Sequence, residues 1–312
     1  MKFRDNREEI LALTPEWHGE RFPDGRPRVS DDILRRIAKC TVTEMWKPLF
    51  VRGYKFQFEG SLKRAVPGTR VMIGRALTAC FLPVRPDLHE HILRQGHEEE
   101  GLKGNINQWP VDMLQPGDVL VYDAFGKVWQ GCAVGGNLAT VMKEKHGAGA
   151  VLWHGIRDLE QVETIEGMQY YYRETDPTPF REVMLRGINV PCHVGGAVCL
   201  PGDVVLGTSG GVIFIPPHLA EYCVIDAEKS HVQDIFGFQR IGEGIYTAAQ
   251  VDSPWTLAIW EDFMGWFAED EKAVPYRHLD FTEELEEIRA GIIRPPVGVP
   301  AAQFRPDGDT KW

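Results

Sequence analysis

The chain has 312 residues, of which 43% are hydrophobic, so it is long enough to bury one sizeable core with or without extensions. Its formal net charge of -11 at pH 7 argues against a general binder of nucleic acid or of anionic membranes, because both need a basic surface. A small anionic substrate is compatible with this charge, since it needs only local positive groups.

Several features bear on the compartment. No apolar run approaches the roughly 20 residues that span a bilayer, and the first residues lack the apolar segment of a secretory signal. None of the six cysteines belongs to a C-x-x-C pair, so we expect buried thiols rather than disulfides or zinc ligands. These features predict a soluble cytoplasmic protein that binds neither membranes nor nucleic acid.

The N-terminal part predicts an arm, a helix and the first of several turns. Residues 1–29 are polar and punctuated by prolines, which predicts an arm outside the core. Helical spacing of apolar residues predicts a helix over Asp31–Lys39, capped by Ser30 or Asp31. Pro-Gly favours a turn and β-branched residues favour a strand, so a turn leading into a strand is predicted three times: Pro67-Gly68-Thr69-Arg70, Pro116-Gly117-Asp118 and Pro201-Gly202-Asp203.

The last two turns are each followed by a second apolar segment, at 126–128 and 210–215, which favours a core of related hairpins. Between them, apolar residues at helical spacing predict a helix over Leu138–His146, with Asn137 as its cap and Gly147 as its terminator. A buried strand is expected directly after this helix. The order strand, helix, strand predicts a crossover with a glycine-rich turn at the N-terminus of the helix.

The rest of the chain predicts further helices and an extension. The buried strand is expected over Ala148–Trp153, and Asp158 is a candidate cap of a second helix that runs to Ile165. Residues 216–229 also have helical spacing. Residues 230–312 are rich in aromatic residues and irregular, so we expect a C-terminal extension that packs on the core or on a neighbouring subunit.

The most informative residues flank the predicted crossover helix: Gly135-Gly136-Asn137-Leu138-Ala139-Thr140 and Gly155-Ile156-Arg157-Asp158. A helix N-terminus offers unpaired N–H groups to a carboxylate or phosphate, and glycine lets the ligand approach closely. Arginine can grip a carboxylate and aspartate can bind Mg²⁺. The same residues are compatible with an ordinary tight turn and a surface ion pair in which Asp158 is only a helix cap.

Taken in order, the motifs resemble the RraA-like family, which includes 4-hydroxy-4-methyl-2-oxoglutarate/4-carboxy-4-hydroxy-2-oxoadipate aldolases. The resemblance rests on Thr41-Val42-Thr43-Glu44, the three Pro-Gly turns and the two segments around the crossover helix, and it spans about residues 40–228. It implies an α/β class protein with an α/β/β/α layered sandwich over residues 30–229. It also implies homotrimers or dimers of trimers, with active sites between subunits.

The resemblance further implies an activity and a site. The family aldolases cleave 4-hydroxy-2-oxo acids to pyruvate with Mg²⁺ or Mn²⁺, and often decarboxylate oxaloacetate. Arg157 corresponds to the arginine that orients the 2-oxo acid, and Asp158 to an aspartate that helps hold the metal. The substrate carboxylate would be bound by the turn amides, at Gly135, Gly136, Asn137 and Leu138.

Two departures from the family pattern concern this site. A family aspartate that contributes to the metal site matches Gly136 here, and the neighbouring Asn137 could not serve as a base. Trp153-His154 stands where the family commonly has Asp-Gly. His154 is therefore a candidate replacement acid or base, because histidine titrates near neutrality, and it is equally compatible with a structural role.

These observations predict a divalent-metal-dependent carbon–carbon lyase, an aldolase or decarboxylase that acts on a small 2-oxo acid and releases pyruvate. One alternative is a sugar-acid dehydratase or enolising enzyme on the same scaffold. Another is a non-catalytic regulator that binds an RNA-degrading enzyme, which the Gly136 departure favours. A segment with His89, His91, His97 and Glu98–Glu100 is interpreted as a solvated charged surface, although the resemblance leaves room for it to line the substrate cleft.

Overall fold

The computed structural model describes residues 2–4, 6–68 and 71–292, and it divides into two compact units. The first unit is Met1–Tyr222 and the second is Cys223–Trp312. Each unit has a hydrophobic core of its own, so each is described separately. Thr69 and Arg70 of the first predicted turn lie outside the described residues, as do residues 293–312 of the C-terminal extension.

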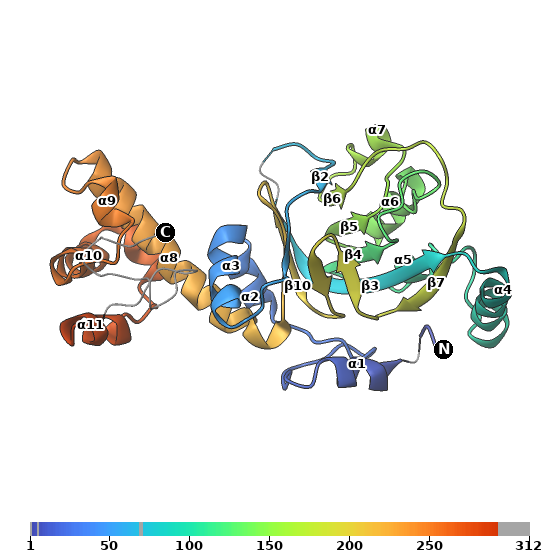
Figure 1. Cartoon of the computed structure of the whole chain (residues 1–312), viewed down its shortest axis with the longest axis horizontal. Helices are drawn as coiled ribbons and strands as arrows, with labels where there is room; N and C mark the ends of the chain where they lie inside the picture. Colours follow the sequence, from blue (N-terminus) through green and yellow to red (C-terminus); the bar gives the residue numbers. More distant parts are fainter. Residues whose placement is uncertain (1, 5, 69–70, 293–312) are drawn as a thin grey trace. The chain divides into compact units, whose positions relative to one another are not determined.

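The first unit is built on a mixed nine-stranded sheet (Figure 1). Strands β3 to β6 run parallel, whereas β3 is antiparallel to both β10 and β7. The strands in sheet order are β1 (Phe58–Glu59), β11 (Gly211–Ile215), β10 (Val204–Thr208), β3 (Met72–Pro83), β4 (Asp118–Asp123), β5 (Gly149–Trp153), β6 (Gln169–Tyr172) and β2 (Lys63–Arg64), with β7 (Val183–Ile188) beside β3.

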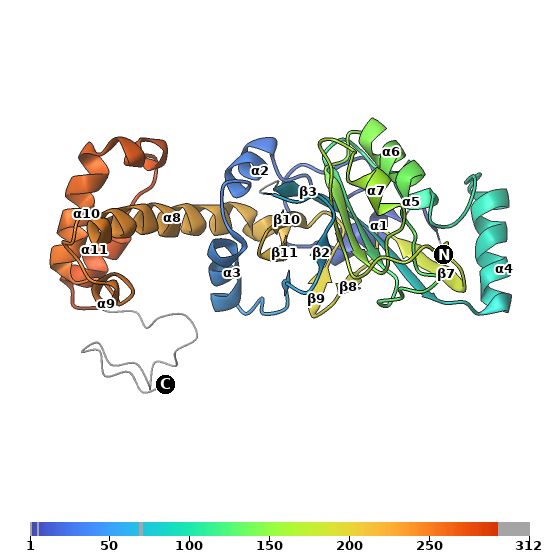
Figure 2. The same ribbon diagram turned by 90° about the horizontal axis from the view of Figure 1, so that it is seen from above.

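Both faces of this sheet are covered, as the unbroken burial of β4 requires. Leu120 and Tyr122 belong to the core on the helical face, whereas Val119 and Val121 pack with a small hairpin on the other face. The helical face carries α5 (Trp109–Asp112), α6 (Gly136–Glu144) and α7 (Leu159–Val162), and the hairpin consists of β8 (Cys192–Val194) and β9 (Ala197–Cys199) (Figure 2). The predicted layered α/β fold is confirmed.

The remaining helices of the first unit lie around the sheet, and α4 packs beside β7 (Figure 1). They are α1 (Arg7–Leu13), α2 (Asp31–Ile37), α3 (Val42–Val51), α4 (Pro86–Arg94), a π-helical turn (Gln95–Glu99) and a 3-10 turn (Pro217–Leu219). The predicted cap of α2 is confirmed, because the Ser30 side chain accepts a hydrogen bond from the Ile33 amide. The expectation that residues 1–29 lie outside the core is wrong, because Phe3 belongs to the main core of this unit and Ile10 and Arg26 are fully buried.

The prediction of related hairpins is correct for one copy and wrong for the other. After Pro201-Gly202-Asp203 the chain forms the antiparallel pair β10 and β11, as expected. After Pro116-Gly117-Asp118 it forms β4 alone, and residues 126–128 lie in a turn region without a strand. The physical reason is that β4 already pairs with β3 and β5 along its two edges, so the chain cannot fold back on it.

The second unit is helical, so the expectation of irregular structure after residue 230 is wrong. Its helices are α8 (Ala220–Gly242, shared with the end of the first unit), α9 (Ala248–Val251), α10 (Leu257–Glu269), a 3-10 helix (Glu271–Tyr276) and α11 (Thr282–Arg289). Thr256 caps α10, and Trp260, Phe263 and Phe267 recur on its buried face at helical spacing. Aromatic rings fill the core of this unit. The packing of the extension on a neighbouring subunit stays a prediction.

Two further expectations concern cysteines and membranes. All six cysteines are buried, and no disulfide joins any of them in the described residues, which confirms the prediction of buried thiols. Within residues 2–292, apart from the gaps noted above, no helix is both long and apolar enough to cross a bilayer.

Candidate active site

The crossover from β4 through α6 to β5 brings the two informative loops together at the carboxyl ends of parallel strands. Backbone bridges continue past the strand ends, because Val134 pairs with Ile156 in parallel and the Arg157 amide donates to the Val134 carbonyl. Ligands of open α/β sheets commonly bind at this edge. The Gly135 turn and Arg157 are therefore held side by side by the sheet.

The start of α6 differs by two residues from the prediction. Gly135 is the N-cap and Gly136 the first helical residue, so the assignment of Asn137 as the cap is wrong. Asn137 instead lies in the first turn with an exposed side chain. The early start leaves first-turn N–H groups without intrahelical partners next to the Arg157 loop.

Asp158 is the N-cap residue of α7, as predicted, but its side chain bonds to the start of α6 instead. Its backbone is left-handed with φ 55°, and its side chain makes no capping bond to α7. The carboxylate accepts a hydrogen bond of 3.3 Å from the Gly136 amide and lies 3.7 Å from Arg157 Nε. A Cβ at Gly135 would lie 3.0 Å from Arg157 Nε and closer still to the Asp158 carboxylate, so this arrangement requires glycine at position 135.

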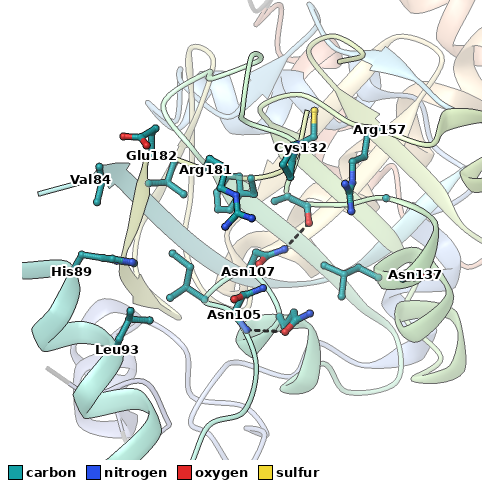
Figure 3. A pocket seen from close by; sticks show the side chains of 18 residues that line it. Val84, His89, Leu93, Asn105, Asn107, Cys132, Asn137, Arg157, Arg181 and Glu182 are labelled. Carbon is teal, nitrogen blue, oxygen red and sulfur yellow. Dashed lines mark hydrogen bonds between the residues drawn. The ribbon is translucent and has the colours of Figure 1, made fainter. Parts of the chain in front are cut away.

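A cavity of about 460 Å³ opens beside this loop pair. Four of the predicted site residues line it: Gly135, Asn137, Leu138 and Arg157. The side chains of Arg157 and Arg181 approach the cavity from different loops (Figure 3). Glu182 supplies a carboxylate to the same lining. With two arginines and one carboxylate, the cavity lining has a net positive charge, whereas the whole chain has a net charge of -11.

The cavity also contains residues that the sequence did not single out as a site: Asn105, Asn107, Arg181 and Glu182. They come from segments far apart in the chain and carry no recognisable motif, so only the fold brings them to Arg157. His89 of α4 lines the cavity as well, which agrees with a cleft role for that residue of the histidine-rich segment. His91 and His97 do not; His91 contacts Arg94 and His97 bonds to the Leu102 carbonyl.

Six non-glycine residues in the described part of the chain have left-handed backbone, and three of them lie in or next to segments that line the cavity. Gln130, Asp158 and Glu182 all have left-handed backbone, with φ of 52°, 55° and 57°, although none is glycine. The Arg181 amide donates to the Gln130 carbonyl, which links two of these strained segments. Such strain costs of the order of 1–3 kcal/mol per residue and is often retained at functional sites.

His154 lies in the core and is not part of the cavity lining. Its ring stacks obliquely between Tyr122 and Phe180, and Nδ1 bonds to the Gly155 carbonyl. Burial lowers the pKa of His154 to about 4, so its imidazole is neutral at pH 7. This position gives no support to His154 as an acid or base, and its catalytic role stays a prediction.

Few side chains near Arg157 could hold the divalent metal that the family resemblance implies. Within the described part of the chain, no three His, Cys, Asp or Glu side chains form a metal-binding group. The Asp158 carboxylate is nevertheless half exposed, and the Gln161 side-chain oxygen lies where a side chain at Gly136 would begin. One carboxylate and one amide oxygen fit Mg²⁺, which often takes one or two protein ligands together with substrate oxygens and waters.

Comparison with known proteins identifies the family. The sequence profile described as "RraA-like: Aldolase/RraA" matches residues 29–214, which is more than half of the chain. The chain belongs to the RraA-like family. A Halalkalibacterium halodurans protein named "Putative 4-hydroxy-4-methyl-2-oxoglutarate aldolase" is 32% identical to it over 120 residues. That alignment covers 38% of this chain and 56% of the relative, so the chain matches just over half of that protein's length.

Solved structures show the RraA-like fold as well. Streptomyces coelicolor RraAS2, described as an unusual member of the RNase ES inhibitor RraA protein family, superposes with a TM-score of 0.58 at 26% identity. The alignment covers 68% of this chain and all of that one. An uncharacterised Pseudomonas syringae protein has a TM-score of 0.58 at 19% identity over 72% of this chain and 99% of its own, which supports the fold alone.

Proposed function

We propose that this RraA-like protein is a divalent-metal-dependent carbon–carbon lyase that releases pyruvate from a small 2-oxo acid. The observation that carries the proposal is the pairing of the Arg157 guanidinium with the glycine N-terminus of α6 on one cavity. The chain has a net charge of -11, so a local cluster of cationic and N–H donors in its cavity favours an anionic substrate.

The Gly135 turn and the Arg157 loop would bind different groups of the substrate. The first-turn amides of α6, at Asn137 and Leu138, would donate hydrogen bonds to the carboxylate of the 2-oxo acid. Arg157 would then donate to the oxo oxygen, where negative charge develops when the neighbouring C–C bond breaks. A donor held at such a position stabilises the enolate more than the ground state, which lowers the barrier.

Asp158, with Gln161 beside it, is where this chain would hold the metal. A divalent cation at such a position supplies Lewis-acid stabilisation of the enolate. Asp158 also fixes the start of α6 through the Gly136 amide and lies next to Arg157. We expect Asp158 to position both substrate-binding elements in addition to its metal contact.

Decarboxylation demands less of the site than aldol cleavage. Aldol cleavage needs a base for the 4-hydroxyl group, and His154 is buried away from the cavity. Loss of CO₂ needs only enolate stabilisation, which Arg157 and the metal would provide. Oxaloacetate is therefore the first substrate to test, followed by 4-hydroxy-2-oxo acids.

The test is pyruvate release with Mg²⁺ or Mn²⁺ and with EDTA. We expect EDTA to abolish turnover and Arg157→Ala to lower kcat about 100- to 1,000-fold, the usual effect of removing one oxyanion donor. Arg157→Lys should recover only part of the rate, since a lysine lacks the planar fork. The control is Arg35→Ala, which removes an exposed ion pair with Asp32 on α2. An unchanged rate in Arg157→Ala would overturn the assignment.

A second candidate is a non-catalytic regulator of an RNA-degrading enzyme. It is favoured by Gly136, which removes a family carboxylate, and by the structural likeness to an RNase ES inhibitor family member. A purified chain that inhibits such a nuclease and releases no pyruvate from any tested acid would support it. Metal-dependent pyruvate release would favour the lyase.

The assembly and compartment belong to the proposal too. A homotrimer or a dimer of trimers in the cytoplasm, with active sites between subunits, stays a prediction of the family resemblance. Light scattering coupled to size exclusion would give the mass in solution. A monomer that is fully active would contradict a shared site.

A further inference from the structure

Two Pro-Gly-Asp turns bury an aspartate, and they differ in how the charge is compensated. Asp118 accepts hydrogen bonds of 3.0 and 2.9 Å from the two terminal nitrogens of Arg26 and one from the Gln115 amide. Asp203 occupies the matching place in the other turn and accepts one hydrogen bond of 2.8 Å, from the Leu200 amide. Across the described residues, no cationic side chain pairs with Asp203.

Asp203 is only 2% exposed, yet it lines a second cavity. This cavity has a volume of about 230 Å³ and shares no residue with the candidate active site. Its walls come from the N-terminal arm at Leu13–Trp17, from Tyr54 and Gln57, from Val198 and Leu200, and from Pro216–His218. Most of these side chains are apolar or aromatic, so a ligand there would mainly contact apolar surface.

The charges around this cavity favour a cation. Glu16 supplies a second carboxylate to the lining, and neither lysine nor arginine is among its described residues. His218 bonds to the Tyr54 hydroxyl through Nε2, and burial lowers the pKa of His218, which favours the neutral ring. Trp17 and Tyr54 add aromatic faces, which attract organic cations.

An unpaired carboxylate in such a place is costly, because burial removes its hydration. Arg26 offsets this cost for Asp118, and an ammonium or guanidinium group brought by a ligand would offset it for Asp203. We propose that the cavity beneath the arm binds a small organic cation, a primary amine or guanidine on an apolar body, with Asp203 as the counter-ion. This site is independent of the lyase proposal.

The direct test is calorimetric titration of the full chain with benzylamine and with benzyl alcohol, its neutral isostere. We expect benzylamine to bind and benzyl alcohol to bind at least tenfold more weakly. Asp203→Asn should lower the affinity for benzylamine at least tenfold, because the amide retains the shape and loses the charge. The matched control is Glu20→Gln, an acidic arm residue that pairs with Arg28 outside the cavity, and it should leave the affinity unchanged.

A second variant keeps the test informative if Asp203→Asn does not fold. Val198→Trp fills the cavity from a partly exposed position on β9, so it should also abolish binding. The pH gives a further readout, because burial raises the pKa of Asp203 to about 7. Affinity for benzylamine should rise between pH 6 and 8 as Asp203 ionises; Glu16, Tyr54 and His218 are the other titratable groups that line the cavity. Equal affinity for the amine and the alcohol, unchanged affinity in Asp203→Asn, or no binding at all would overturn the proposal.

Discussion

The two glycines at the start of α6 have different structural roles. A Cβ at Gly135 would meet the carboxylate of Asp158 and the Arg157 side chain, so position 135 keeps both groups in place. A Cβ at Gly136 would meet only the exposed Gln161 side chain, most closely its amide oxygen and next its Cδ and Cβ. The Gln161 amide therefore occupies the space that a side chain at position 136 would need.

The buried His154 should make the stability of the chain depend on pH. Its native pKa of about 4 lies below the value near 6.5 of an unfolded histidine, so the unfolded state binds the proton first on acidification. Stability should fall as pH drops from 6.5 towards 4, by at most about 3 kcal/mol from this group, at about 1.4 kcal/mol per pKa unit.

Urea unfolding of wild type and His154→Leu between pH 7.5 and 4.5 measures this effect. The variant should gain stability relative to wild type as the pH falls, because it lacks the group that loses stability. The exposed His91→Leu serves as the control and should follow the wild type. Parallel pH profiles for wild type and His154→Leu would contradict the buried neutral imidazole.

Single residues were predictable from the sequence where a motif carried them. Arg157, Gly135, Asn137 and Leu138 line the cavity as their motifs indicated. Arg181 could not be found this way, since its place depends on β7 pairing with β3 across a long sequence separation. His154 appeared reactive in the sequence because it lies three positions before Arg157, but its ring is buried in the core.

At the scale of elements, strand pairing determined which predictions from local sequence were correct. The same Pro-Gly-Asp turn leads into a hairpin at β10 and into a crossover at β4, because the edges available to each strand differ. Turn chemistry specifies where a strand begins, but the sheet specifies its partners. The helix of the crossover was predictable from its apolar spacing. Its start was not, because its N-cap residue is Gly135 and the carboxylate that bonds to its first amide, Asp158, comes from a loop 22 residues further along the chain.

A buried ion pair between Arg26 and Asp118 joins the N-terminal arm to β4, so we expect its loss to destabilise the first unit. Arg26 and Asp118 are both fully buried, so removing one partner leaves the other charged and unpaired in the core. Arg26→Met should destabilise the chain by about 3–5 kcal/mol. Arg28→Met breaks the partly exposed pair with Glu20 in the same arm and should cost at most about 1 kcal/mol.

A double-mutant cycle separates the pair from other effects of these changes. Arg26→Met combined with Asp118→Asn should cost less than the sum of the two single variants, since the double variant leaves no buried charge alone. The measurement is chemical denaturation of the four chains. Additive costs would show that the two side chains contribute independently.

At the scale of the whole molecule, the net charge of the chain and the charge of the cavity lining have opposite signs. A net charge of -11 opposes association with nucleic acid, whereas Arg157 and Arg181 concentrate positive charge on one cavity. The sign of the total charge does not indicate what the cavity binds, and the expected lack of nucleic-acid binding stays a prediction. The layered fold was predictable from the family resemblance that the motifs carry. The helical second unit was missed, although Trp260, Phe263 and Phe267 of α10 recur at helical spacing.

The stability of the second unit should depend on its aromatic core. Phe263 is fully buried and its ring contacts Phe236, Trp260 and Phe281, whereas the candidate site lies wholly in the first unit. Phe263→Ala should destabilise the second unit by about 3–5 kcal/mol, because it leaves a cavity among packed rings. In calorimetry we expect one of two transitions to move to lower temperature. Pyruvate release at low temperature should be unchanged.

The control is Phe238→Ala on α8, whose side chain is 69% exposed and which should change stability by no more than about 0.5 kcal/mol. If each unit is stabilised by its own core, only one of the two thermal unfolding transitions should shift. A single transition that shifts as a whole in Phe263→Ala would mean instead that the long α8 helix couples the two cores, since it contributes residues to both units. Calorimetry on these two variants therefore decides between separate units and one cooperative molecule.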